Sequence, residues 1–325
     1  MEKSVLFTNL IQKLDKKNIL YSLNEPLAPK STFKVGSTCS LFLAPKTLEQ
    51  FKEALTLIIN SKIPFYILGG GSNTVFPDTN YDGVIISTEN LKKIDIVDTK
   101  ENKESTTVYI RCLAGTPVQA LVNFCTDNCL TGMEQFAGLP GSVGGAVYMN
   151  ARCFNKSINE LFSSAIYITP DTATLDKLDY NEEEWAYKKS PFQPKNGSGA
   201  IESHKYVLEV IFKLTKISSD NKADIEQECK KYINERVSKG HFKFPSAGSV
   251  FKNNRAFGKP SGQLIDEAGL RGIKIGGAQI APFHGNFIIN IGNAKQEDIK
   301  ALVAKVIDTV QQRFNFTLEA EIIFL

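Results

Sequence analysis

The chain has 325 residues, of which 42% are hydrophobic and 22% charged, and it carries a formal net charge of +3 with a pI near 8.4. This basic excess is too small for a typical nucleic-acid-binding domain, whose pI normally exceeds about 9. Six scattered cysteines without a CxxC pair, and only three histidines, argue against a metal site and favour reduced thiols. The length exceeds what one hydrophobic core usually serves, so two or three domains are expected.

The N-terminal segment, residues 1–18, predicts a short amphipathic helix with Val5, Leu6, Leu10 and Ile11 on one side. No stretch approaches the roughly 18 apolar residues that a membrane-spanning helix needs. We therefore expect a cytoplasmic protein that contacts neither a membrane nor nucleic acid. The expected state is a monomer.

Helical and strand patterns alternate from residue 46 to residue 129. Residues 46–62 predict a helix with four apolar side chains at helical spacing: Phe51, Leu55, Ile58 and Ile59. Strands are predicted at 65–68, 83–87 and 106–115. Thr116 and Pro117 then have the composition of an N-cap and a first-turn proline, which predicts a helix over 118–129.

The second half of the chain contains fewer predicted elements. Strand patterns at 163–169 and 206–215 flank a polar stretch at 181–199 that is rich in turn residues at its end. A charged helix is predicted over 222–239, an amphipathic helix over 297–314 and a closing strand over 317–325. We expect an α+β protein with a larger region at 1–217, split near residue 85, and a smaller C-terminal domain at 218–325.

Two glycine-rich stretches are candidate ligand sites. "YILGGGSNTVFPD", residues 66–78, ends a predicted strand in three glycines, and "GLPGSVGGAVYMN", residues 138–150, has the pattern of neither an ordinary helix nor an ordinary strand. Consecutive backbone N–H groups in such turns can cradle phosphate oxygens. The first stretch matches neither the GxGxxG fingerprint nor a P-loop. Two such loops suit a cofactor of the nucleotide type. The structural alternative is a tight turn for the first stretch and a compact β-rich junction for the second.

Three further stretches place polar residues next to glycine or among apolar residues. Ser249 lies in "FPSAGSVFKN", His284 in "GGAQIAPFHGNFIIN", and Glu319 and Glu321 alternate with apolar residues in the closing strand. Each has a structural explanation when it is taken alone, as a turn, a structural histidine or a solvated strand edge. No GxSxG elbow is present, which disfavours a hydrolase triad.

The order of these motifs is more specific than any one of them. "LGGGSN", "GLPGSVGGAVYMNA", "YKKSPF", "PSAGSVFKN", "IGGAQI…HGNFIIN" and "LEAEI" together resemble the UDP-N-acetylenolpyruvoylglucosamine reductase family, also called UDP-N-acetylmuramate dehydrogenases. "NEPLAPKSTFKVGS" is similar to the family's entry segment, so the resemblance covers nearly the whole chain. The short spacing between "YKKS" and "PSAGS" resembles the shorter form of the family.

The resemblance implies a fold and a cofactor. The fold is a flavin domain of the vanillyl-alcohol oxidase and p-cresol methylhydroxylase type, followed by a smaller α+β substrate-binding domain. FAD and NADPH serve the family's reduction of UDP-N-acetylglucosamine enolpyruvate to UDP-N-acetylmuramate, a peptidoglycan precursor. Main-chain amides of both glycine loops are expected to face the FAD diphosphate, with no side chain between chain and cofactor. The positions carried over are Gly69, Gly70, Gly71, Ser72, Asn73, Gly138, Leu139, Pro140, Gly141, Ser142, Gly144, Gly145, Ala146 and Asn150.

The resemblance also implies catalytic residues. Hydride from the reduced flavin reaches C3 of the enolpyruvyl group, negative charge spreads from C2 into the carboxylate, and C2 must be protonated. Ser249 matches the family's proton donor, and Glu321 matches a glutamate that hydrogen-bonds or protonates the enolate carboxylate. Lys188 stands where the family usually has a catalytic arginine, and lysine lacks the planar fork of that side chain. Three explanations compete. Lys188 fills this role and is the first candidate, another cation such as Arg152 fills it, or the activity of the protein is low.

Substrate contacts are implied for Tyr187, Arg236, Lys239, Asn253 and His284, with the arginine and the second lysine facing the substrate diphosphate. No metal is implied. Two alternatives stay open at this point. The chain could be another FAD oxidoreductase of the same fold, or a non-catalytic relative that binds flavin or a nucleotide sugar, which the Lys188 substitution alone favours.

Overall fold

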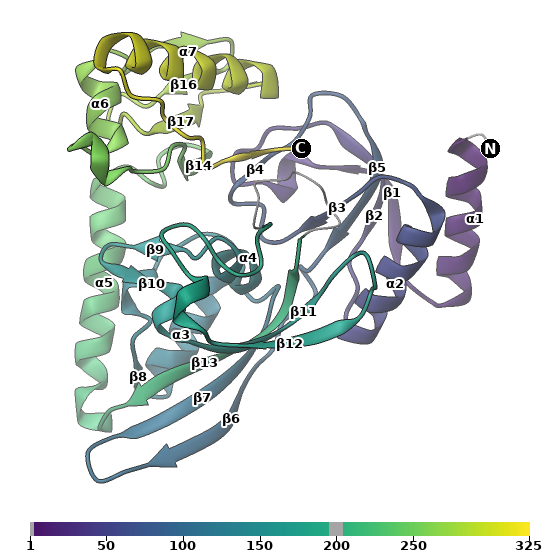
Figure 1. The fold of residues 1–325 in the computed structure, drawn as a ribbon, viewed down its shortest axis with the longest axis vertical. Coiled ribbons are helices and arrows are strands. Elements are labelled where there is room, and N and C mark those ends of the chain that lie inside the picture. The colour runs from purple at the N-terminus through teal and green to yellow at the C-terminus, as the bar shows by residue number, and fades with distance from the viewer. Residues whose placement is uncertain (1–2, 195–203) are drawn as a thin grey trace. The chain divides into compact units, whose positions relative to one another are not determined.

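The computed structural model describes residues 3–194 and 204–325, which form two compact units (Figure 1). Unit 1 comprises Met1–Leu23, Leu41–Gly70 and Asp82–Ile233, and unit 2 comprises Asn24–Ser40, Gly71–Tyr81 and Asn234–Leu325. The units therefore interleave along the chain. The boundary expected between residues 217 and 218, and the split near 85, stay predictions.

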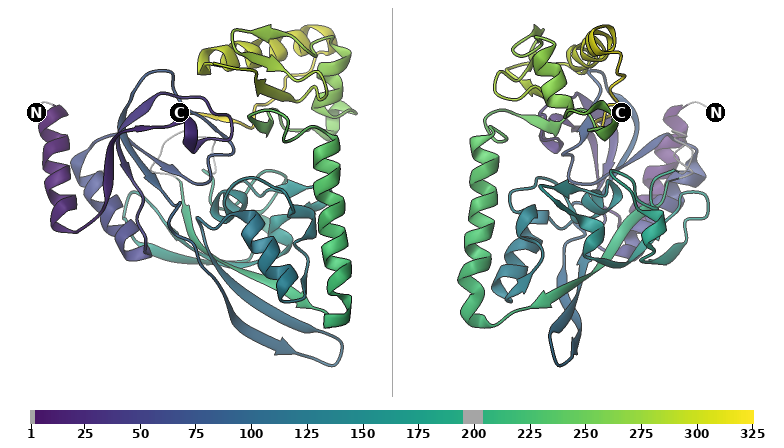
Figure 2. Two further views of the ribbon diagram at one scale, coloured as in Figure 1. Left: turned by 180° about the vertical axis from the view of Figure 1, so that it is seen from behind. Right: turned by 60° about the vertical axis from the view of Figure 1, so that its left-hand side comes forward.

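The larger sheet of unit 1 is antiparallel and has the strand order β12-β11-β13-β7-β6, with β8 beside β13. Helices α3, α4 and the first part of α5 pack on it through a core that includes Leu121, Val147, Phe212 and Ile225. Figure 2 shows α3 and this part of α5 side by side. The elements are β6 (Ile94–Glu101), β7 (Thr106–Leu113), α3 (Val118–Asp127), β8 (Leu130–Thr131), α4 (Val143–Tyr148), β9 (Arg152–Cys153), β10 (Lys156–Ser157), β11 (Phe162–Ile168), β12 (Leu175–Asp179), β13 (Tyr206–Lys216) and α5 (Lys222–Ser238).

A second sheet has the strand order β1-β2-β5-β3, and its strands β3 and β5 are parallel. Leu10 and Leu14 of α1 and Phe51 and Leu55 of α2 are buried in the same core as Val84 and Ile86 of β5. Parallel strands end at the same edge of a sheet, so the chain leaves β3 and β5 side by side. The elements are α1 (Lys3–Lys16), β1 (Tyr21–Pro26), β2 (Thr38–Leu43), α2 (Leu48–Ser61), β3 (Phe65–Leu68) and β5 (Tyr81–Ser87).

Unit 2 contains an antiparallel sheet of order β14-β17-β16-β15 and a parallel pair, β4 with β18. Helices α6 and α7 share one core with this sheet and with Phe33, Val35 and Val75 from the N-terminal third of the chain. The elements are β4 (Thr74–Val75), β14 (Ser246–Ser249), α6 (Ser261–Glu267), β15 (Lys274–Ile275), β16 (Ala278–Ile280), β17 (Phe287–Asn290), α7 (Gln296–Phe314) and β18 (Ile323–Phe324).

The structure confirms most elements that the apolar pattern predicted. The predicted helices form α1, α2, α3, α5 and α7, and the predicted strands form β3, β5, β7, β11 and β13. On α1 the buried residues are Leu10 and Leu14, whereas Val5 is exposed. The edge strand β6 was not predicted, because its sequence IDIVDTKE is mostly exposed and lacks an alternating pattern. The first two residues of the expected N-terminal helix, and positions 195–199 of the polar stretch, lie outside the described residues.

Three local expectations are wrong. The second glycine stretch does contain a helix, α4, capped by Ser142. Pro117 rather than Thr116 occupies the cap position of α3, because the Thr116 hydroxyl instead bonds with the main chain of Lys93. The closing segment 317–325 is strand only at β18, apart from an isolated bridge between Ala320 and Phe251.

The six cysteines are all free thiols. Burial raises the pKa of Cys112 to about 12, so this thiol stays protonated and packs as a small apolar group. Within residues 3–194 and 204–325, no cluster of His, Cys, Asp or Glu side chains could hold a metal ion. In the same part of the chain, no helix has both the length and the apolar character to cross a bilayer.

Candidate functional site

Several chain connections of unit 1 converge where β3 ends in the first glycine stretch. The main-chain N–H of Thr88, just after β5, donates to the carbonyl of Leu68 at 2.9 Å. The N–H of Gly115, just after β7, donates to Leu91 O at 2.9 Å, and the N–H of Gly144 donates to Ala114 O at 2.8 Å. Backbone bonding therefore joins the ends of β3, β5 and β7 to the second glycine stretch.

Ser142 connects the two glycine stretches directly. Its hydroxyl oxygen accepts hydrogen bonds from the N–H of Gly70 at 3.1 Å and from the N–H of Gly145 at 3.4 Å. The second bond caps the N-terminus of α4, and the residue is 4% exposed. One buried hydroxyl thus fixes the first loop against the start of a helix in the second.

Glycine is needed at several positions because another part of the protein occupies the space of a side chain. A Cβ on Gly70 would lie 2.6 Å from Gly141 Cα, and a Cβ on Gly144 would lie 2.7 Å from Ala114 Cβ. A Cβ on Gly115 would lie 1.7 Å from Thr88 O. At these positions glycine allows one backbone to pack on another. The expected contact of Gly70 and Gly144 with the cofactor stays a prediction.

Gly145 differs from its neighbour Gly144. A Cβ on Gly145 would have only the Ser142 hydroxyl oxygen within 4 Å, at 3.5 Å. The residue is partly exposed, whereas Gly144 is buried. Within the second glycine stretch, position 145 therefore has open space in front of it.

The main-chain donors of these loops fit an anionic ligand. Among the described residues, no acceptor takes the N–H groups of Gly141 or Ser142 in unit 1, and none takes those of Gly71 or Ser72 in unit 2. Unpaired N–H groups in a glycine-rich turn form an anion-binding concavity. The diphosphate of FAD has the oxygens that such donors bind, so the residues present fit this cofactor.

The "YKKS" segment forms a tight turn near the end of α4. Ala186 and Lys189 bond to each other through both main-chain groups, at 3.0 and 3.2 Å, which places Tyr187 and Lys188 at the tip of the turn. Lys188 has φ +58° and is half-buried, and Tyr187 is exposed. The hydroxyl of Ser190 donates to Tyr148 O at 2.6 Å, which attaches the turn to the residue that ends α4.

Arg152, the alternative cation, lies in the hairpin of β9 and β10. Its guanidinium donates to the Ser157 hydroxyl at 3.3 Å, on the opposite strand of that hairpin. Burial raises the pKa of the Glu160 carboxyl, but bonds from Ser157 N–H and Lys156, with a smaller contribution from the Arg152 charge, together outweigh it and hold this pKa below its usual value. The described interactions of Arg152 are thus with Ser157 in its own hairpin and with Glu160 just after it.

In unit 2, the "AGS" segment and the closing segment are joined by main-chain bonds. The N–H of Glu321 donates to Val250 O at 2.7 Å, and the N–H of Lys252 donates to Glu319 O at 2.9 Å. Ser249 directly precedes Val250 and is exposed at the end of β14. The two segments that carry Ser249 and Glu321 therefore lie side by side.

Two predicted ligand-contacting asparagines already bind the protein through their side chains. The amide of Asn73 donates to Glu321 O at 3.0 Å, and Asn73 O accepts from Ile323 N–H at 2.9 Å. The carbonyl oxygen of the Asn253 side chain accepts from Ser261 N–H, the first residue of α6, at 2.9 Å. Asn73 therefore links the first glycine stretch to the backbone of Glu321.

The remaining predicted substrate residues of unit 2 lie near its histidines. Arg236 is 6% exposed, and its carbonyl accepts from His241 N–H at 3.1 Å. Lys239 forms an ion pair with Glu235 at 2.5 Å.

His241 and His284 both pack against Phe287, at ring distances of 4.7 and 4.2 Å. Burial, with the nearby charges of Arg236 and Lys239 and with His284, lowers the pKa of His241 to about 4. Burial also lowers the pKa of His284.

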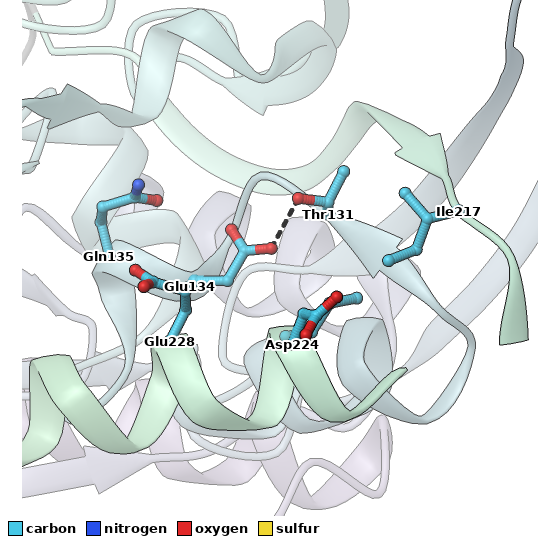
Figure 3. A pocket seen from close by; sticks show the side chains of 7 residues that line it. Thr131, Glu134, Gln135, Ile217, Asp224 and Glu228 are labelled. Carbon is cyan, nitrogen blue, oxygen red and sulfur yellow. Dashed lines mark hydrogen bonds between the residues drawn. The ribbon is translucent and has the colours of Figure 1, made fainter. Parts of the chain in front are cut away.

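A separate hollow of about 240 Å³ lies between β8 and α5 in unit 1 (Figure 3). Three carboxylates line it, those of Glu134, Asp224 and Glu228. The Glu134 carboxylate already accepts from the Thr131 hydroxyl at 2.7 Å and from Gly132 N–H at 2.9 Å. None of its lining residues belongs to the glycine stretches or to the "YKKS" turn, so this hollow is distinct from the candidate site.

The sequence analysis placed Ala114 and Gly115 in a strand and Thr116 at a helix cap, and it missed that these residues form the connection that supports α4. Val143 N–H donates to Thr116 O at 2.9 Å, beside the bond from Gly144 to Ala114. The only local sign of this connection was the run of small residues that follows β7. The connection bonds to the second glycine stretch, and a local sequence pattern does not reveal such a distant partner.

Comparisons with known proteins agree with this arrangement. Residues 240–325 match the family model of the UDP-N-acetylenolpyruvoylglucosamine reductase C-terminal domain, and residues 39–172 match that of an FAD binding domain. The chain is 45% identical to the UDP-N-acetylenolpyruvoylglucosamine reductase of Treponema denticola over 92% of both chains. It is 40% identical to that of Borreliella burgdorferi over 100% of this chain and 99% of the relative.

A solved structure is also similar. The crystal structure of UDP-N-acetylenolpyruvylglucosamine reductase from Thermus caldophilus shares 28% identity and has a TM-score of 0.72, covering 94% of this chain and 98% of that chain. The expected α+β fold, with an FAD-binding domain and a family-specific C-terminal domain, is thereby confirmed.

Proposed function

Because this chain belongs to the UDP-N-acetylenolpyruvoylglucosamine reductase family, we propose that its glycine loops, Ser249, Glu321 and Lys188 carry the family's reaction. The protein is an FAD-dependent oxidoreductase that uses NADPH to convert UDP-N-acetylglucosamine enolpyruvate into UDP-N-acetylmuramate for peptidoglycan. The observation that carries the assignment of residues is the bonded pair Glu321 N–H and Val250 O, which brings two distant motifs of the family together.

The two glycine stretches would hold the cofactor. Bound FAD, once reduced by NADPH, supplies the hydride that reaches C3 of the enolpyruvyl group. The N–H groups of Gly71, Ser72, Gly141 and Ser142 are the donors for its diphosphate, because no acceptor in the described chain takes them. Gly145 leaves space in front of the second stretch. The contributions of Gly69, Gly138, Leu139, Pro140 and Ala146 to the cofactor site stay predictions.

Ser249 is proposed to protonate C2 of the substrate. It is exposed at the end of β14, directly after Gly248, whose φ of +73° favours glycine. The chain just after it is anchored, because the side chain of Asn286 bonds both the N–H and the O of Phe251 at 2.8 Å. Ser249 thus lies next to an anchored segment, which favours a positioned proton donor.

Glu321 is proposed to bind the carboxylate end of the enolate that forms when hydride adds at C3. Its N–H is bonded to Val250 O and its carbonyl accepts from the Asn73 amide. The backbone is therefore fixed on both sides of this side chain. A pre-positioned hydrogen-bonding group at the site of developing charge lowers the barrier without reorganisation.

Lys188 is proposed to supply the positive charge that the family's arginine usually supplies. The enolate needs compensating charge more than a particular planar shape, and lysine keeps the charge. The described interactions of Arg152 are with Ser157 and Glu160, close to it in the chain, which supports Lys188 over Arg152.

The UDP part of the substrate is proposed to contact unit 2 through Arg236, Lys239, Asn253 and His284, and Tyr187 to contact the sugar or the nicotinamide. Cations suit a diphosphate. A cytoplasmic monomer is the proposed state.

Half-reactions test this function directly. The purified protein is reduced with NADPH without oxygen, and UDP-N-acetylglucosamine enolpyruvate is then added. We expect the flavin absorbance to bleach and then recover. Bleaching without recovery would indicate an FAD oxidoreductase that acts on another substrate. A protein that cannot bind FAD would point to a non-catalytic relative. In Ser249→Ala, recovery should slow by about 10²–10⁴-fold while bleaching keeps its rate, as expected for loss of a proton donor.

A further inference from the structure

The segment that follows α4 supports the turn that carries Lys188. The Asn150 side-chain amide donates to Ala186 O at 2.8 Å. Tyr148 O accepts from the Ser190 hydroxyl at 2.6 Å and from the Gln193 amide at 2.9 Å. Both ends of the "YKKS" turn are therefore attached to the last residues of the second glycine motif.

Both polar atoms of the Asn150 side chain form hydrogen bonds within the protein. Its side chain is 3% exposed, and its Oδ1 accepts from Asn159 N–H at 3.4 Å while its Nδ2 binds Ala186 O. Its φ of +41° lies in the left-handed region, where asparagine is more tolerated than most residues. Asn150 is thus a buried junction between the end of α4, the short segment that follows β10, and the turn.

The turn itself has an unfavourable conformation at its tip. Ala186 O also accepts from Lys189 N–H at 3.0 Å, so residues 186–189 form a β-turn with Lys188 in the third position. Lys188 has φ +58°, a value that this position of a type II turn usually reserves for glycine or asparagine. A strained residue of this kind persists only where its surroundings hold it in place.

We propose that Asn150 is a positioning residue that holds the base of this turn and thereby directs the Lys188 ammonium toward the substrate. The inference rests on the proposed role of Lys188 in charge stabilisation. The expectation that Asn150 contacts FAD stays a prediction beside it, because the amide has a second hydrogen. Since Ser142 attaches the start of α4 to Gly70, this short helix links the first glycine loop to the turn.

The test is the substitution Asn150→Asp in the full-length protein loaded with FAD. Aspartate keeps the size and tolerates the left-handed conformation, but it cannot donate to Ala186 O. The matched control is Asn181→Asp, at the exposed cap that accepts from Glu183 N–H, where aspartate still accepts. Asn150→Gly, which keeps the positive φ without the side chain, is the second variant if the aspartate variant does not fold.

Stopped-flow measurements of both half-reactions supply the readout. We expect Asn150→Asp to leave flavin reduction by NADPH within about twofold and to slow reoxidation by the enolpyruvyl substrate about 10- to 100-fold. In a Lys188→Ala background, the same substitution should change reoxidation by less than about twofold, because residues that act as a unit are not additive. Asn181→Asp should leave both rates unchanged.

Other outcomes overturn the inference in recognisable ways. Equal slowing of both half-reactions, or additive effects with Lys188→Ala, would mean a general structural role. Weaker FAD binding with a normal reoxidation rate would mean that Asn150 contacts the cofactor. If Lys188→Ala slows reoxidation and Asn150→Asp does not, only the positioning role fails. If Lys188→Ala itself has no effect, the proposed role of Lys188 fails and the inference fails with it.

Discussion

The hydroxyl oxygen of Ser142 lies 3.1 Å from the main-chain nitrogen of Gly70, 72 positions earlier in the chain, and accepts its hydrogen bond. The same oxygen accepts from Gly145 N–H and caps α4. One side chain therefore sets the distance between two loops that are expected to share a cofactor. Its removal should affect both protein stability and FAD affinity.

Ser142→Ala should lower the free energy of unfolding by about 1–2 kcal/mol, because a cap and a buried acceptor are lost together. FAD affinity should fall as well, since Gly70 is no longer fixed against the second loop. Thermal unfolding of the apoprotein and titration of flavin fluorescence measure the two effects.

Thr47→Ala is the matched control for this substitution. Thr47 caps α2 by accepting from Gln50 N–H and contacts neither glycine loop. It should cost about 1 kcal/mol of stability and leave FAD affinity unchanged. Equal loss of FAD affinity in both variants would show that Ser142 acts only through stability.

Gly144→Ala and Gly145→Ala should have opposite effects. The Cβ at position 144 would lie 2.7 Å from Ala114 Cβ in a buried site, so we expect a loss of about 1–3 kcal/mol in unfolding free energy. At position 145 the nearest atom lies at 3.5 Å, so the apoprotein should be as stable as the parent or slightly more stable.

The Gly145 variant is informative about the cofactor. Its methyl group would enter the open space before the second loop, so FAD affinity should fall at least tenfold, or about 1.4 kcal/mol. Unchanged affinity would show that position 145 does not face FAD. Apoprotein melting curves and equilibrium titration with FAD separate the two effects.

Lys188→Ala should slow reoxidation of the reduced enzyme by the enolpyruvyl substrate by about 10²–10³-fold, because a charge aimed at the transition state is removed. Lys188→Arg should stay within about tenfold of the parent, since it restores the residue usual in the family and keeps the charge. Flavin reduction by NADPH serves as the internal control. An alanine variant with the parent rate would shift the role to another cation such as Arg152.

Acid should destabilise unit 2 through His241. Its pKa of about 4 in the folded protein is below its usual value of 6.5, first because of burial and then because of Arg236, His284 and Lys239. The unfolded chain therefore binds the proton more readily. Stability from this group is complete above pH 6.5 and is lost as the pH falls towards 4. We expect a loss of about 2 kcal/mol after allowance for partial exposure.

His241→Gln should flatten this part of the pH profile. Urea unfolding at pH 7 and at pH 4.5 should show a smaller difference for the variant than for the parent. Lys243→Gln, at an exposed neighbour, is the control and should keep the parent's profile. A profile identical to the parent's in His241→Gln would assign the acid sensitivity to other groups, of which His284 is the first, since its pKa is also lowered.

Elements with a strong apolar period were predictable, and those without it were not. The helix α7 buries Ile299, Leu302 and Val306, as its sequence pattern indicates. The short helix α4 escaped prediction because two of its six residues are glycine, and its helical form depends on the Ser142 cap and on bonds to the β7–α3 connection. Edge strand β6 escaped because its exposed residues need no alternation.

The sequence by itself determined the family, the cofactor and the candidate residues, because motif identity and order are properties of the chain alone. Only the tertiary structure decided what these residues do for one another. It showed that Gly70 and Gly144 make room for other segments of the protein, that Asn73 binds the backbone of Glu321, and that Asn150 binds the Lys188 turn. These contacts join residues far apart in the chain, and local patterns describe only neighbours in sequence. Hydrogen bonds between distant segments form only when packing of the hydrophobic cores brings those segments together.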